Sequence, residues 1–162
     1  MRHATTVNAM PFDTYELTFA NSLPVTMQFQ LEALLFFNAG QHHLRREIAA
    51  TIERYGVPEI VSTEEGLTVE LKGSPDAQVL FAIQRSDGKQ RPVGFILYLR
   101  DQLERLTVLH VGVAPDHVSG AMYGAQRVLS RLLNQIRFRA RNTAGVRAVS
   151  IAYRGTQVRL SG

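Results

Sequence analysis

The sequence predicts one α/β domain in which a mostly antiparallel, mixed sheet is flanked by helices. Three observations predict this class. Apolar residues are spaced for helices in the first third, at alternate positions from residue 66, and for a helix again after Asp116, before a final strand. The 162 residues suit a single domain over 1–162, of which 1–12 is expected to be flexible. A domain of this size buries roughly 70% of the surface that its unfolded chain exposes.

The first third predicts a short strand followed by two helices. Residues 15–20 (YELTFA) alternate in polarity and predict the strand. Apolar side chains at helical spacing over 27–35 predict a helix that stops near Gly40. A second helix is expected over 41–55 and is ended by Gly56. The link between the two helices is short, so they should pack as a hairpin.

Four strands are expected in the middle of the chain, forming an antiparallel meander. Asp87 and Gly88 mark a tight hairpin between the second and third strands, because this pair tolerates positive φ. Pro115 ends the fourth strand. The expected strands cover residues 67–71, 79–84, 93–100 and 106–113.

The last third predicts a loop, a long helix and one more strand. The loop covers 116–123 and leads into a helix that continues to about Asn142. Residues 146–153 (VRAVSIAY) predict the strand. Because strand, helix and strand follow in that order, this strand should lie parallel to strand 106–113, through a right-handed crossover.

The net charge of +4 hides a strong asymmetry along the chain. Residues 1–116 contain all 14 acidic residues and 10 of the 18 Lys and Arg, a net charge of −4. The remainder contains no acid and a net charge of +8. It is either a solvated helix face or an electropositive surface for phosphate, carboxylate or nucleic acid, and Arg favours bidentate anion recognition. Its basic residues are Arg127, Arg131, Arg137, Arg139, Arg141, Arg147, Arg154 and Arg159.

Composition excludes several classes of site. The absence of cysteine excludes disulfides, thiolate zinc sites and a cysteine nucleophile. No apolar run approaches the ~20 residues of a membrane span, and no signal-peptide core follows Arg2, so a cytoplasmic location without membrane partners is expected. His42 and His43 would point about 100° apart on a helix, and no metal site is predicted.

Three stretches of the sequence are informative together with the order of the elements, namely 93–96 (VGFI), 109–115 (LHVGVAP) and 128–133 (VLSRLL). In these features the chain resembles the GNAT superfamily of acyl-CoA N-acyltransferases, and the resemblance covers roughly residues 25–155. The family's R/Q-x-x-G-x-G/A loop is replaced here by VSGAMYGA, with different glycine spacing and no Arg or Gln. The family's further helix and two strands have no counterpart. The chain is therefore expected to be a divergent, C-terminally short member.

The resemblance implies an acyl-CoA, such as acetyl-CoA, as co-substrate. A helix N-terminus offers unpaired N–H groups and the positive end of the helix dipole, and glycines allow close approach of a phosphate. The pyrophosphate would lie on the loop, Arg127 would reach a second phosphate, and pantetheine would follow the preceding strand. The implied binding residues are Val111, Val113, Val118, Ser119, Gly120, Ala121 and Arg127.

Catalysis would need a base for the amine and an acid for the leaving thiolate. His110 is the candidate base, with an ordinary pKa near ~6.5, and a buried structural histidine is the alternative. Tyr153 is the candidate acid, with packing as its alternative. Glu70 and Glu104 are further candidate bases, and His117 either contacts a ligand phosphate or is merely exposed.

Three functions follow from these observations. The first is transfer of an acyl group, with acetyl the expected one, from acyl-CoA to an unknown amine acceptor. The second is a catalytically inactive GNAT-fold interaction module that forms a homodimer through an open sheet edge. The third is nucleic-acid binding by the arginine-rich helix, although no nucleic-acid motif is present.

Overall fold

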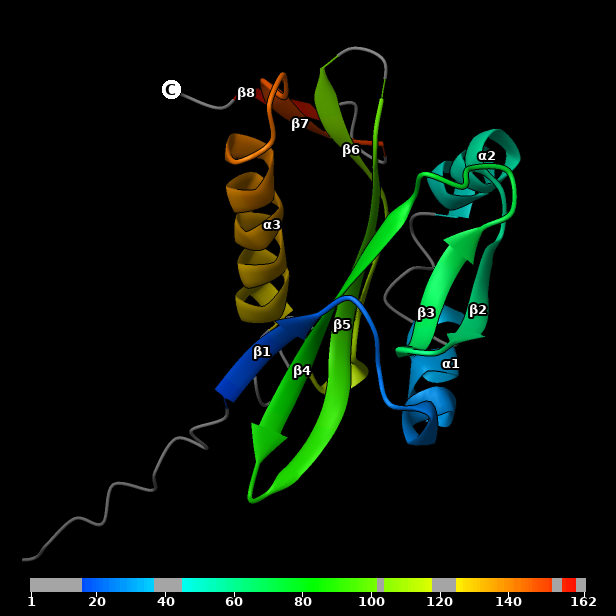
Figure 1. The fold of residues 1–162 in the computed structure, drawn as a ribbon, viewed down its shortest axis with the longest axis vertical. Coiled ribbons are helices and arrows are strands. Elements are labelled where there is room, and N and C mark those ends of the chain that lie inside the picture. Colours follow the sequence, from blue (N-terminus) through cyan, green and yellow to red (C-terminus); the bar gives the residue numbers. More distant parts are fainter. Residues whose placement is uncertain (1–15, 37–44, 102–103, 118–124, 153–155, 160–162) are drawn as a thin grey trace, which may run out of the picture.

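The computed structural model describes residues 16–36, 45–101, 104–117, 125–152 and 156–159. One six-stranded sheet runs through them, with its strands in the order β1-β4-β5-β6-β7-β8 (Figure 1). Its strands are β1 (Glu16–Ala20), β4 (Gln78–Ser86), β5 (Lys89–Arg100), β6 (Arg105–Val113), β7 (Ala148–Ile151) and β8 (Thr156–Arg159). The predicted α/β class with a mixed, mostly antiparallel sheet is confirmed.

Strand directions agree with the sequence over most of this sheet. β4, β5 and β6 form an antiparallel meander, with Asp87 and Gly88 at positive φ in the turn between the first two. β6 and β7 are parallel, as predicted, and pair over 105–108 and 148–151. The short first strand is also confirmed, because β1 pairs antiparallel with residues 81–85 of β4.

The predicted four-stranded meander is wrong in its first member. Residues 67–71 belong to β3 (Gly66–Leu71), which pairs with β2 (Pro58–Thr63) in a separate two-stranded sheet. β1 occupies the β4 edge that β3 was expected to take. β2 escaped prediction because the residues between it and β3 are Glu64 and Glu65, which are not typical of a hairpin turn.

Three α-helices cover the sheet in the part of the chain that the structure describes. They are α1 (Gln28–Phe36), α2 (Arg45–Tyr55) and α3 (Ala125–Arg141), with short 3-10 turns at η1 (Val25–Met27) and η3 (Pro115–His117). The predicted end of α2 is confirmed, since Gly56 follows it and its N–H bonds to the Ile52 carbonyl at 2.8 Å. The link 37–44 lies outside the described residues, so the helix hairpin stays a prediction.

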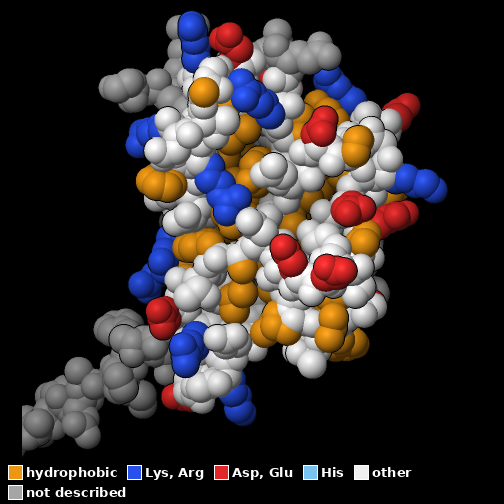
Figure 2. Space-filling view, in the orientation of Figure 1, with side chains coloured by type: hydrophobic (Ala, Val, Ile, Leu, Met, Phe, Trp, Pro, Cys, Tyr) orange, Lys and Arg blue, Asp and Glu red, His pale blue; other side chains and the backbone are white. Residues whose placement is uncertain are grey.

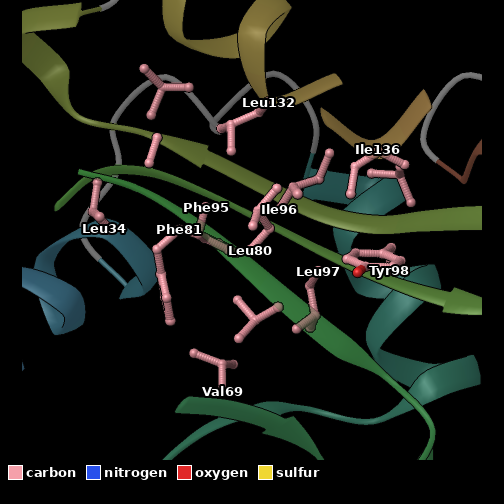
Figure 3. Close-up of a cluster of buried hydrophobic side chains, with 14 of the residues drawn as sticks. Leu34, Val69, Leu80, Phe81, Phe95, Ile96, Leu97, Tyr98, Leu132 and Ile136 are labelled. Atoms are coloured by element: carbon pink, nitrogen blue, oxygen red, sulfur yellow. The ribbon is translucent and has the colours of Figure 1, made fainter. Parts of the chain in front are cut away.

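The molecule has three layers, with α3 on one face of the large sheet and α1, α2 and the β2–β3 hairpin on the other (Figure 1). Figure 3 shows Leu132 and Ile136 of α3 on one side of the sheet and Val69 of β3 on the other. All three side chains are almost completely buried. Both faces of β4 and β5 are therefore covered, which explains why their sequences are apolar on both sides.

Gly94 of β5 lets α3 lie close to the sheet. A Cβ atom at this position would be 2.9 Å from Val128 Cγ1 and 3.1 Å from Leu132 Cδ1. Real Cβ atoms do not approach other atoms this closely, so a larger residue would push α3 outward. The glycine thus sets the distance between the helix and the strand.

We expect Gly94→Ala to lower the free energy of unfolding by about 1–3 kcal/mol, because the added methyl group overpacks this contact. Val128→Ala removes the nearest obstructing atom, so the double variant should lose less than the sum of the two single losses. Urea unfolding of the four proteins measures this coupling. Strictly additive losses would contradict the proposed contact.

Candidate functional site

The structure describes only part of the predicted acyl-CoA site. Val111 and Val113 lie in the carboxyl half of β6, and Arg127 lies exposed in the first turn of α3. The loop residues and the candidate acid lie outside the described residues. These are Val118, Ser119, Gly120, Ala121 and Tyr153.

The strand–helix–strand unit β6–α3–β7 provides the frame of the site. β6 and β7 pair over 105–108 and 148–151, and the Ala152 N–H bonds to the Val108 carbonyl at 2.9 Å. β6 continues beyond this ladder to Val113, past a register irregularity opposite Leu97 and Tyr98. The carboxyl end of β6 and the start of α3 are joined through η3 and the loop.

A polar network fixes η3 to the sheet. The guanidinium of Arg91 on β5 pairs with the Asp116 carboxylate, with Nη1 and Oδ1 3.2 Å apart, and donates from Nη2 to Gln84 Oε1 at 3.1 Å. The same oxygen lies 2.8 Å from His117 Nε2. Two strands thereby hold the turn from which the predicted loop begins.

The pKa shifts in this network favour a neutral His117 beside charged neighbours. Burial lowers the pKa of His117, Asp116 acts to raise it, and Arg91 lowers it further. Partial burial acts to raise the pKa of Asp116, but the hydrogen bond and charge of Arg91 hold it below its ordinary value. A neutral His117 that faces a carbonyl oxygen donates its Nε2 proton to Gln84.

His117 is fully buried, so the expectation that it is exposed is wrong. Its hydrogen bond to Gln84 gives it an anchoring role at the start of the loop. The sequence did not single out Gln84, Arg91 or Asp116 as partners. The available signals were a glutamine inside an apolar strand and an acidic residue directly after Pro115.

His110, the candidate base, lies within the sheet opposite Leu97 of β5. Its side chain is 5% exposed, and burial lowers its pKa to about 4. The imidazole is therefore neutral at physiological pH and a weak proton acceptor. This burial favours the interpretation of His110 as a buried structural histidine. The further candidate bases are both exposed, Glu70 on β3 and Glu104 just before β6.

Several of the clustered arginines bind other parts of the domain. Arg139 donates to the Tyr98 hydroxyl at 2.8 Å and to Asn21 Oδ1 at 3.1 Å. The guanidinium carbon of Arg131 lies 5.5 Å from the centre of the Phe19 ring. These contacts tie α3 to β1 and β5 and leave fewer cations for an extended nucleic-acid surface.

The charge asymmetry of the sequence becomes a difference between two sides of the molecule. In Figure 2 most of the basic side chains follow the α3 side, and most of the acidic ones gather on the side of the β2–β3 hairpin. Glu59, Glu64, Glu65 and Glu70 are exposed on that hairpin. An anionic ligand is therefore attracted to the α3 side.

No protein-family model matches the sequence, and a search of curated proteins finds no match either. Among the described residues, no His, Asp and Glu cluster has the geometry of a metal site. None of the helices in the described part of the chain combines the length and apolar character needed to cross a bilayer.

We expect the free energy of unfolding to fall as the pH is lowered from 6.5 to about 4, because unfolded His110 takes up its proton near 6.5 and folded His110 near 4. The unfolded state binds more protons in this window, and the contribution of His110 approaches about 3 kcal/mol. Urea unfolding at several pH values measures it. His110→Gln should remove this share of the pH dependence and leave the contributions of His117 and Asp116, whose pKa values are also lowered. An unchanged pH dependence in the variant would contradict the assignment.

Proposed function

We propose that this chain is a GNAT-like acyltransferase domain that acts in the cytoplasm. It binds acetyl-CoA or another acyl-CoA where β6 leads into α3 and transfers the acyl group to an amine. The β6–α3–β7 unit carries the proposal, because its parallel strands and intervening helix match the order that the resemblance requires. The absence of cysteine fits this compartment.

The charge and anchoring of the junction support an anionic ligand there. The start of a helix carries the positive end of the helix dipole. Arg127 adds an exposed cation in the first turn. The network of Gln84, Arg91, Asp116 and His117 fixes the chain immediately before residue 118.

Pantetheine is an extended chain with two amides, so it can lie beside a strand and exchange hydrogen bonds with the backbone. Following the resemblance, we assign it to the carboxyl half of β6, beside Val111 and Val113. The thioester would then lie farther along the sheet than the pyrophosphate. This separation is what a site for a long, flexible cofactor needs.

The reaction assigned to the site is attack of a neutral amine on the thioester carbonyl. The C–N bond forms, the C–S bond breaks, the amine loses a proton and the thiolate gains one. His110 is the proposed base and Tyr153 the proposed acid. With a pKa of about 4, His110 would accept the proton late, after the C–N bond has formed and the nitrogen has become more acidic.

We expect acetyl-CoA at about 100 times its Kd to stabilise the protein by about 2.7 kcal/mol, as measured by thermal melting. Arg127→Ala should weaken binding about tenfold, because it removes a charged contact to phosphate. Arg141→Ala is the matched control, since Arg141 is equally exposed at the other end of α3. No stabilisation by acetyl-CoA, propionyl-CoA or free CoA would refute acyl-CoA binding.

A second candidate function is the inactive interaction module that forms a homodimer. Within the described residues β8 lies at the edge of the large sheet and pairs only with β7. An open edge can pair with another chain, and a two-fold pair of β8 strands would join two sheets into one.

If this module is correct, light scattering at high protein concentration should give the mass of a dimer. Val158→Pro on β8 removes one backbone N–H and should convert the dimer to a monomer. Thermal melting of Val158→Pro checks that the variant remains folded. A monomeric mass for the unmodified protein would refute pairing through this edge.

The third candidate function is nucleic-acid binding, and the basic side chains along α3 are the observation that supports it. Arg131 and Arg139 already contact Phe19, Tyr98 and Asn21. A short DNA duplex included in the melting series tests it, because a phosphate-driven complex would weaken steeply as salt is raised.

A further inference from the structure

A cleft lies at the opposite end of α3 from the proposed acyl-CoA site. Its volume is about 720 Å³, and it lies between the last turn of α3, the start of β4 and the end of β5. A smaller hollow of about 300 Å³ beside β3 shares some of its lining. The lining residues that carry the argument are Asn21, Gln78, Tyr98, Arg100, Phe138 and Arg139.

Two arginines, Arg100 and Arg139, line this cleft. Arg139 is partly buried and donates to two neutral oxygens, those of Tyr98 and Asn21. Among the described residues, neither arginine forms an ion pair. Asp76 also lines the cleft and pairs with neither arginine. Two basic residues and one acidic residue therefore belong to the described lining of one hollow.

The guanidinium of Arg100 lies against the backbone that follows α3. A Cβ atom at Gly145 would lie 2.8 Å from Arg100 Nη2. Gly145 also has a φ of +80°, which disfavours any residue with a side chain. A side chain at this position would therefore both strain the turn and displace the end of Arg100.

The polar wall around Arg139 is preassembled. The Tyr98 hydroxyl, which accepts from Arg139, donates to Gln78 Oε1 at 3.0 Å. This chain joins α3, β5 and β4 and holds the guanidinium in place before any ligand binds. A held guanidinium loses less side-chain entropy on binding an anion.

Phe138 adds an apolar, solvent-exposed side chain to the lining of the cleft. Its side chain is 64% exposed although it is a large aromatic residue on an amphipathic helix. A flat ring can stack on it, while the charged end of the same molecule reaches Arg100 and Arg139.

We propose that this cleft binds a small organic anion that carries a phosphate or carboxylate group beside a flat or apolar part. The helix dipole explains basic residues in the last turn of α3, but it does not explain Arg100, which comes from β5. The cleft is separate from the proposed acyl-CoA site, because the 17 residues of α3 span about 25 Å.

Isothermal titration of the whole chain with AMP, benzoate and adenosine tests this proposal. We expect AMP or benzoate to bind with saturation, and adenosine, which lacks the anion, to bind at least about tenfold more weakly than AMP. Binding of AMP alone identifies phosphate as the recognised group, and binding of benzoate alone identifies carboxylate. Failure of both to bind at millimolar concentration would overturn the proposal.

Matched variants locate the site. Arg100→Gln and Arg139→Gln should each weaken binding of the anion at least about tenfold. Gly145→Ala keeps both charges but displaces Arg100, and it should also weaken binding. Arg141→Gln removes the same charge from the same helix end without lining the cleft, so its affinity should stay close to that of the unmodified protein.

Equal weakening by Arg141→Gln would show diffuse charge attraction and overturn the proposal. Thermal melting checks that each variant is folded, and Arg139→Lys, which keeps the charge, should bind better than Arg139→Gln. Arg100→Gln should leave stabilisation by acetyl-CoA unchanged. Loss of that stabilisation would mean that the two sites are one and would refute a separate cleft.

Discussion

The close packing of α3 on Gly94 brings the helix against β5, and the two candidate sites lie at the ends of this helix. Val128 and Leu132 rest where a larger side chain at position 94 would intrude, so the first half of the helix lies close to the sheet. Arg131 and Arg139 hold the second half, through the Phe19 ring and the Tyr98 hydroxyl. Both candidate sites therefore depend on the same packed helix.

The fold separates the arginines that are clustered in the sequence into different roles. Arg131 and Arg139 fasten α3 to β1 and to β5, which are far apart along the chain. Arg127 and Arg141 remain exposed at opposite ends of the helix. A basic segment has therefore been divided between internal contacts and two separate surfaces, and a single continuous patch for a polyanion is the less favourable interpretation.

Periodicity predicted the elements whose faces differ in polarity or whose interior is fully apolar. The meander of β4, β5 and β6, the amphipathic α3 and the parallel β7 all follow from such patterns. The pairing between β2 and β3 did not follow from such a pattern. Alternation predicts that residues 66–71 form a strand, but it does not predict the strand with which they pair.

The same limit applies to the sites. Sequence order placed Val111, Val113 and Arg127 near one junction, because strand ends and helix starts are local properties of the chain. The network around Gln84 joins residues up to 33 positions apart, and Arg139 reaches Asn21 across 118. Contacts between residues so far apart depend on how the elements pack, and no regular spacing in the sequence predicts them. His110 illustrates the other difficulty, since its residue type suits a base whereas burial lowers its pKa to about 4.

The two proposed anion sites at the ends of α3 differ in their physical basis. At its start the positive end of the helix dipole would act together with the exposed cation of Arg127. At its end the dipole opposes an anion with an effective charge of about −0.5, so positive charge must come from side chains. The charge of Arg139 alone would do little more than balance the negative charge at this end of the helix. Arg100, brought from the sheet and seated against Gly145, supplies the excess positive charge that turns a capped helix end into a candidate anion site.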